Sequence, residues 1–164
     1  MSVLYKIYQD LGIAENIQFV IHSLGDDKSK EKYRLALMNY YTGKERNLCD
    51  DCRKSLEEES PFSLLTCAEE DCKILSDLAP LSDSYINKKS KDHYQKVKDF
   101  LDIMELPYVS EGVPSVSLEN HNDIVFSVKY TSGDMSVLLG TGGRHDSLSQ
   151  KMGSTKEIPA FGFS

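Results

Sequence analysis

The sequence predicts an α+β fold in which an antiparallel sheet is flanked by helices and carries a small helical insertion. Two observations support this prediction. After Pro107, two apolar runs at residues 124–130 and 136–139 are separated by a polar turn with a glycine, which is the pattern of an antiparallel hairpin. Earlier in the chain, residues 43–86 hold all four cysteines and several short apolar runs without a strand pattern, which favours short helices broken at Pro61 and Pro80.

The first part of the chain, residues 1–42, reads as helix, strand and helix. Residues 3–11 show helical spacing and end at Gly12, and the β-branched run at 17–21 predicts a buried strand. A helix over 28–42 follows, capped by Asp26 or Asp27. The apolar residues expected on one side of these two helices are Leu4, Ile7, Tyr8 and Leu11, and then Tyr33, Leu37, Tyr40 and Tyr41.

The last part, residues 87–164, opens with a long helix and continues into the hairpin. Asn87 is a suitable cap, and the helix runs to about Glu105 with an apolar stripe formed by Tyr94, Val97, Leu101 and Met104. The strand at 136–139 is followed by Gly140, Gly142 and Gly143 and then by a short helix over about 145–152. We therefore expect three parts, with boundaries at 1–42, 43–86 and 87–164.

The composition is globular and argues against two classes of partner. Of 164 residues, 40% are hydrophobic and 27% charged, and no apolar run is long enough to span a membrane. The net charge of −7 argues against a generally basic surface for nucleic acid. The lysine-rich segment 88–98 is interleaved with Asp92, which favours a solvated helix face over an RNA contact. No secretory pattern precedes the first helix, so a cytoplasmic location is expected.

Two groups of residues are candidates for a ligand-binding or metal-binding site. The run Gly140-Thr141-Gly142-Gly143 lacks the Gly-Lys-Ser/Thr ending of a phosphate loop and indicates a close backbone approach. Arg144 offers a planar donor fork, and Asp146 is placed either to orient that fork or to cap the next helix. The spacings Cys49-x-x-Cys52 and Cys67-x-x-x-x-Cys72 are compatible with a structural zinc site of four thiolates, although two tight pairs would indicate it more strongly. Free buried thiols are the alternative interpretation of the four cysteines.

Several segments resemble histidyl-tRNA synthetases, which are class II aminoacyl-tRNA synthetases, and they do so in the same order along the chain. Residues 142–148 are similar to the family's Gly-Gly-Arg-Tyr-Asp-Gly-Leu segment, and residues 158–164 to the opening of its motif 3. Residues 21–25 with 33–37, residues 48–56, and residues 85–94 are similar to further family segments. The resemblance implies the C-terminal part of the catalytic domain with its insertion region, and hence a class II synthetase-like antiparallel sheet.

The resemblance also implies a histidine pocket, for which the corresponding residues are Glu119, His121, Gly142, Gly143, Arg144 and His145. His121 and His145 are the histidines of interest, because both stand where the family places a tyrosine near its amino-acid pocket. The reaction implied is ATP-dependent attachment of histidine to tRNA(His), with ATP and magnesium as cofactors and histidine and tRNA(His) as partners.

The departures from the family leave the activity open. The position of the family's catalytic arginine is Val116, motifs 1 and 2 do not occur in the chain, and motif 3 stops at Ser164, so no residue is assigned as catalytic. We therefore expect a partial histidine–tRNA ligase that is inactive alone and needs another polypeptide or a second copy of itself. The alternatives are a non-catalytic, synthetase-derived module that binds an amino acid or a protein, and a zinc-stabilised interaction domain.

Overall fold

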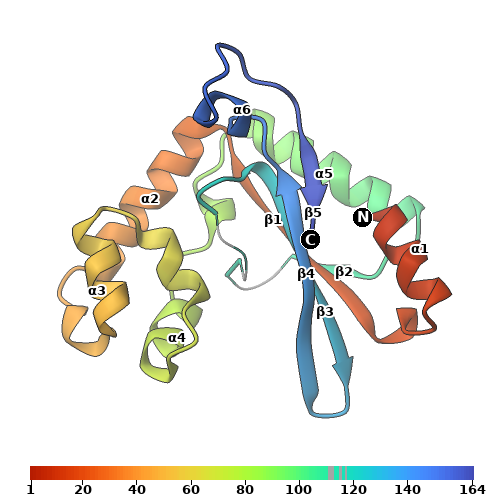
Figure 1. The fold of residues 1–164 in the computed structure, drawn as a ribbon, viewed down its shortest axis with the longest axis horizontal. Coiled ribbons are helices and arrows are strands. Elements are labelled where there is room, and N and C mark those ends of the chain that lie inside the picture. Colours follow the sequence, from red (N-terminus) through yellow and green to blue (C-terminus); the bar gives the residue numbers. More distant parts are fainter. Residues whose placement is uncertain (111–112, 115, 117) are drawn as a thin grey trace.

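A computed structural model describes the whole chain except residues 111–112, 115 and 117. Its centre is a five-stranded sheet with the strand order β2-β1-β3-β4-β5 (Figure 1). The strands are β1 (Ile17–Gly25), β2 (Tyr108–Val109), β3 (Asn122–Ser132), β4 (Met135–Arg144) and β5 (Phe161–Phe163). All neighbouring strands pair antiparallel except β1 and β2, which are parallel. The predicted α+β fold and the β3–β4 hairpin are confirmed.

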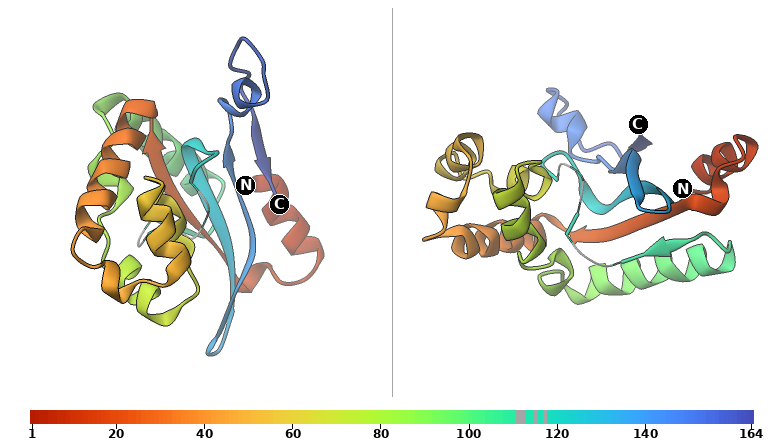
Figure 2. Two further views of the ribbon diagram at one scale, coloured as in Figure 1. Left: turned by 60° about the vertical axis from the view of Figure 1, so that its left-hand side comes forward. Right: turned by 90° about the horizontal axis from the view of Figure 1, so that it is seen from below.

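Six α-helices surround this sheet in the described part of the chain. They are α1 (Ser2–Asp10), α2 (Asp27–Tyr41), α3 (Asp50–Glu57), α4 (Glu70–Asp77), α5 (Lys88–Ile103) and α6 (Leu148–Lys151). Short 3-10 turns lie at Ala14–Asn16, Glu45–Asn47, Pro61–Thr66 and Ser82–Ser84. Figure 2 shows α5 lying along one face of the sheet, whereas α3 and α4 lie together beside its end. No helix in the described ranges is long and apolar enough to cross a membrane.

Two hydrophobic clusters hold the helices to the sheet. The first lies under α1 and α5, where Tyr94 and Leu101 of α5 and Leu4 and Tyr8 of α1 pack against strand residues. Those strand residues are Ile17, Phe19, Ile21, Ile124, Phe126 and Val128. The second cluster joins α2 to the helices of the insertion and includes Tyr33, Leu37, Tyr41, Cys52, Phe62, Leu64, Leu65, Cys72, Val116, Leu118 and Val125. The insertion is therefore packed on the core through α2.

The N-cap residues of α2 and α5 are hydrogen-bonded to each other. The Asp26 carboxylate accepts from the backbone N–H of Ser29 at 2.9 Å, and the Asn87 side-chain oxygen accepts from the N–H of Ser90 at 2.9 Å. The Asn87 amide also donates to the second Asp26 oxygen at 2.9 Å. Both predicted caps are confirmed, and the bond between them brings two helix N-termini side by side.

Several details predicted from the sequence are wrong. Ile7 and Leu11 are exposed rather than packed, and Met104 lies just beyond the end of α5 and is exposed. Gly140, Gly142 and Gly143 do not follow the returning strand, because they form its second half. The helix expected over 145–152 covers only Leu148–Lys151, and β2 and β5 were not predicted.

His22 makes the stability of the sheet depend on pH. Its side chain is 4% exposed on β1, and its Nε2 has no hydrogen-bond partner among the described residues. Burial, with a smaller contribution from the charge of Lys129, lowers the pKa of His22 from 6.5 to about 4. Folding therefore favours neutral His22. Its contribution to the free energy of unfolding is fully present above pH 6.5 and is lost as the pH falls toward 4, because the unfolded chain then binds a proton that the folded protein does not.

We expect the free energy of unfolding to fall by roughly 2 kcal/mol between pH 7 and pH 5 through His22 alone. In His22→Leu, which keeps a side chain of similar size without a titrating group, that part of the pH dependence should disappear. Urea unfolding of both proteins at several pH values measures it. Equal slopes of unfolding free energy against pH in the two proteins would contradict this assignment.

Candidate functional site

The glycines of β4 permit a very close approach by the neighbouring strands. Gly142 is paired with Phe126 of β3 and Phe163 of β5, and Gly143 with Val125 and Gly162. A Cβ on Gly142 would lie 2.5 Å from the Gly162 carbonyl oxygen and 2.6 Å from the Phe126 ring. The expected close approach is confirmed, but it occurs within the sheet and involves protein neighbours.

Arg144 ends β4 and is held by Asp146. Its Nε donates to Asp146 Oδ2 at 3.1 Å, and its Nη2 donates to the same oxygen at 2.9 Å and to Oδ1 at 3.1 Å. Asp146 Oδ1 also accepts from the backbone N–H of Ala160 at 2.9 Å, which ties the fork to the segment before β5. The orienting role predicted for Asp146 is therefore present in the geometry.

His121 and His145 pack on each other beside Gly143. Their ring centroids are 4.3 Å apart, and a Cβ on Gly143 would lie 2.7 Å from Cδ2 of His121. His145 Nδ1 lies 3.0 Å from the Asn120 carbonyl oxygen. His121 is only 8% exposed, and its ring covers Gly143.

Glu119 is separate from the histidine pair and faces the insertion. Its carboxylate is hydrogen-bonded to the Ser60 hydroxyl, and its carbonyl oxygen accepts from Lys30 and Lys151, each at 2.9 Å. With Lys30, Ser60 and Phe62 it lines a hollow of about 330 Å³. Burial, and to a smaller extent the charge of Lys151, lowers the pKa of Lys30 to about 8.

A larger cleft of about 940 Å³ lies between the N-termini of α2 and α5, the start of β3 and the end of β4. Arg144 and Asp146 line it, together with charged residues of both signs. The cationic ones are Lys88, Lys89 and Lys96, the acidic ones are Asp26, Asp27, Asp92, Asp123 and Glu157, and His93 also lines the cleft. Of the six residues predicted for the histidine pocket, only Arg144 lines this cleft.

Sequence reasoning missed the contact between His93 and Asp123 in the cleft. His93 Nε2 lies 3.2 Å from an Asp123 carboxylate oxygen, and burial raises the pKa of Asp123. Asp123 also has a φ of 53°, a left-handed conformation that costs energy in a residue other than glycine and is found at functional sites. No local signal in the sequence joins the two residues, which come from α5 and β3.

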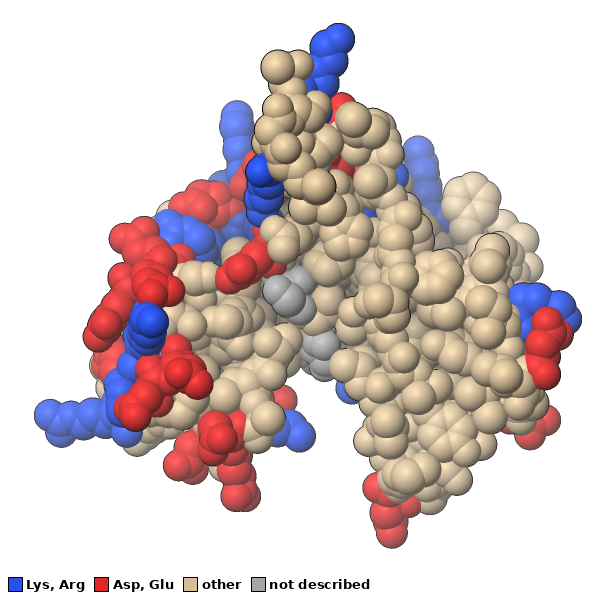
Figure 3. Space-filling view, viewed as in Figure 1, with Lys and Arg blue, Asp and Glu red and all other residues tan. Residues whose placement is uncertain are grey.

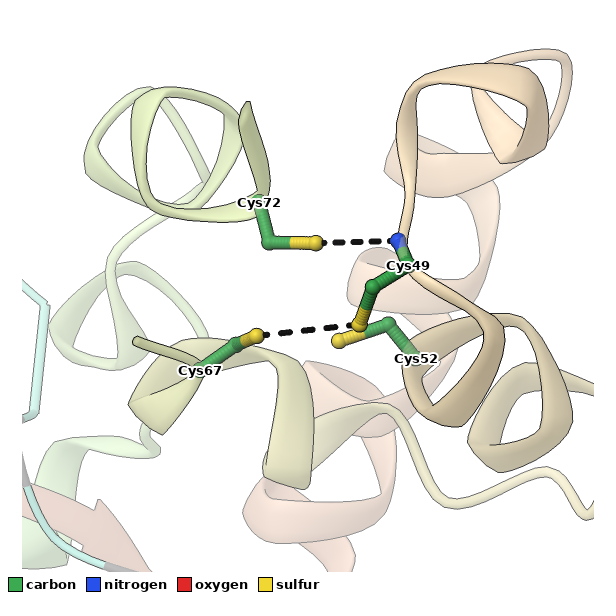
Figure 4. Close-up of side chains that lie close together, drawn as sticks. All are labelled: Cys49, Cys52, Cys67 and Cys72. Atoms are coloured by element: carbon green, nitrogen blue, oxygen red, sulfur yellow. Dashed lines mark hydrogen bonds between the residues drawn. The ribbon is translucent and has the colours of Figure 1, made fainter. Parts of the chain in front are cut away.

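The four cysteines come together in the insertion, as Figure 4 shows. Their sulfur atoms all lie within 4.8 Å of one another. Cys49 Sγ is 3.9 Å from Cys67 Sγ, and the backbone N–H of Cys49 donates to Cys72 Sγ at 3.2 Å. A hydrogen bond from the backbone N–H of Cys52 lowers the pKa of Cys49, whereas burial raises the pKa of Cys72. The cluster has the donor set to hold a metal ion.

Gly142→Ala should destabilise the protein by roughly 1–3 kcal/mol, because the added Cβ meets backbone and a buried ring. Gly162→Ala is the matched control, since a Cβ there meets nothing within 4 Å and the residue lies on the adjoining strand. The control should change the free energy of unfolding by less than about 0.5 kcal/mol. Urea denaturation compares them, and equal effects of the two substitutions would contradict the close packing of β4.

Comparison with known proteins finds histidine–tRNA ligases. The ligase of Aquifex aeolicus is 32% identical over 163 residues, which is 99% of this chain and 39% of the ligase. That of Fervidobacterium nodosum is 35% identical over 162 residues, or 96% of this chain and 36% of the ligase. The crystal structure of apo S. aureus histidyl-tRNA synthetase matches with a TM-score of 0.72 and 25% identity, over 99% of this chain and 38% of that one. No family model matches.

The resemblance predicted from the motifs is thus confirmed along nearly the whole chain. The chain spans less than two-fifths of the length of the ligases that it matches.

Proposed function

We propose that this chain supplies part of the catalytic domain of a histidine–tRNA ligase and contributes to an amino-acid site without itself activating histidine. The reaction of such an enzyme joins histidine to tRNA(His) with ATP and magnesium, and the cytoplasm is where it would take place. The similarity to histidine–tRNA ligases over 99% of the chain supports this proposal.

The observation that carries the amino-acid site is the oriented Arg144 fork at the edge of the large cleft. Asp146 engages Nε and Nη2, which fixes the guanidinium plane while the side chain stays 35% exposed. A planar arginine held in this way suits a carboxylate. The acidic residues on the other walls suit an ammonium group, so the cleft fits a zwitterion such as a free amino acid. Its volume exceeds that of one amino acid and leaves room for a nucleotide.

Val116 supports the proposal that the chain does not itself activate histidine. It stands at the position that corresponds to the catalytic arginine, and its side chain is 4% exposed within the cluster that joins α2 and the insertion. A buried valine offers no donor to the charge that develops on phosphate oxygens, and losing one such donor typically costs about 3–4 kcal/mol of transition-state stabilisation. This feature also favours the alternative, a non-catalytic module that binds an amino acid or a protein.

An uncharged surface supports association with another polypeptide or with a second copy. Figure 3 shows few charged side chains over β3, β4 and β5, whereas charges crowd over α2 and the insertion. On β4 and β5 large apolar side chains are exposed, namely Met135, Val137, Leu138, Leu139, Phe161 and Phe163. In the described residues β5 pairs only with β4, so its other edge is available for a further strand.

Calorimetric titration with histidine tests the amino-acid site. The unaltered chain should bind histidine, and Arg144→Ala should weaken binding by about tenfold or more because a charge-assisted hydrogen bond is lost. Arg46→Ala, an exposed arginine outside the cleft, is the matched control and should bind as the unaltered chain does. Absence of binding at millimolar histidine, or equal binding by all three proteins, would overturn the proposed site.

Histidine-dependent exchange of pyrophosphate into ATP tests the proposed lack of activation. We expect no exchange above background with the chain alone, because Val116 cannot stabilise the transition state. A full-length histidine–tRNA ligase assayed alongside is the positive control. Exchange above background would contradict this part of the proposal. Binding without exchange, even after partner polypeptides are added, would favour the non-catalytic module.

A further inference from the structure

We propose that Cys49, Cys52, Cys67 and Cys72 hold one zinc ion in a tetrahedral site of four thiolates, which fastens the helices of the insertion to each other. None of the four cysteines lines the cleft that contains Arg144, so this site is independent of the proposed function.

The positions of the sulfur atoms match a tetrahedral site. With zinc–sulfur bonds of about 2.3 Å, the sulfurs of a tetrahedron lie about 3.8 Å apart. Cys49 Sγ and Cys67 Sγ are 3.9 Å apart, and all four sulfurs lie within 4.8 Å of one another. No pair of sulfurs would have to close by more than about 1 Å to reach that separation.

Three separate elements bring these ligands together. Cys49 directly precedes α3 and Cys52 lies in its first turn, Cys67 directly follows the 3-10 turn Pro61–Thr66, and Cys72 lies in the first turn of α4. Cys52 and Cys72 thus lie near the positive ends of two helices, which suits negatively charged sulfur ligands around a cation. The segments between these elements are long enough for the chain to place all four cysteines around one ion.

Two hydrogen bonds hold the cysteine cluster in place. The N–H of Cys49 points at Cys72 Sγ at 3.2 Å, as the dashed line in Figure 4 marks. The side chain of Arg53 donates to the carbonyl oxygen of Leu48, which fixes the backbone directly before Cys49. Hydrogen bonds of this kind around the ligands are common at metal sites.

The geometry disfavours the competing interpretations of the cluster. The Cys49–Cys67 sulfur separation is 3.9 Å, nearly twice the length of a disulfide bond, and all four cysteines are free. Two of them, Cys49 and Cys67, are only partly buried, unlike thiols that serve as core packing. Four soft sulfur ligands select zinc over magnesium or calcium. Binding converts four thiols into thiolates and releases their protons to the solvent.

Metal analysis of the full chain purified under reducing conditions tests the site. We expect about one equivalent of zinc per chain, and removal of the metal by a strong chelator should lower the melting temperature. Cobalt added to the metal-free chain should give the intense thiolate-to-cobalt charge-transfer bands of a tetrahedral sulfur site. Less than half an equivalent of zinc together with absence of these bands would overturn the proposal, and iron in place of zinc would overturn its choice of metal.

Variants separate loss of a ligand from loss of structure. Cys67→Ser and Cys72→Ser should each retain little zinc and shift the cobalt spectrum, since one sulfur ligand is lost. Leu56→Ala is the control, because it removes packing from the same cluster of side chains while keeping all four cysteines. The control should be less stable and still bind zinc. Loss of zinc from Leu56→Ala to the same degree as from the cysteine variants would contradict direct ligation.

Discussion

The close contact of β4 with β3 and β5 is the constraint on which the candidate site depends. Gly142 and Gly143 let the three strands approach until a methyl group would clash with carbonyl oxygens and with the Phe126 and His121 rings. This contact sets the end of β4, and therefore the place from which Arg144 and Asp146 reach the cleft. A binding group is best positioned when it is carried by a regular element of the sheet, and Arg144 is carried by β4, which is paired on both sides.

The second hydrophobic cluster links the sheet to the insertion and explains how the chain accommodates Val116. An arginine side chain at that position would need solvent or an anion, whereas Val116 packs among apolar side chains that include Leu118 and Val125. The same cluster contains Cys52 and Cys72, so a metal bound in the insertion would stiffen the packing around α2 as well. The proposed zinc site and the proposed loss of catalysis thus involve the same apolar cluster.

The sequence predicted the elements whose signals are local. The caps Asp26 and Asn87, the β3–β4 hairpin and the pairing of Arg144 with Asp146 each depend on residues close together in the chain. The short strands β2 and β5 were missed, because their pairing is decided by distant partners and not by their own two or three residues.

Contacts between distant segments escaped prediction for the same reason. The spacing of the cysteines left a metal site and free thiols open, and only the fold brings Cys67 within 3.9 Å of Cys49. Likewise, Glu119 and His121 are two residues apart in sequence, yet Glu119 faces the insertion while His121 packs on His145. The contact of His93 with Asp123 depends on the packing of α5 against the sheet.

The end of β4 and the N-termini of α2 and α5 together form the proposed amino-acid site. The most direct measurement follows the backbone amide resonances of the isotope-labelled chain by NMR during titration with histidine. We expect shifts at Arg144 and Asp146 and at the helix starts after Asp26 and Asn87, with the amides of the cysteine cluster unchanged. Shifts confined to the hollow beside Glu119, or no shifts at millimolar histidine, would contradict it.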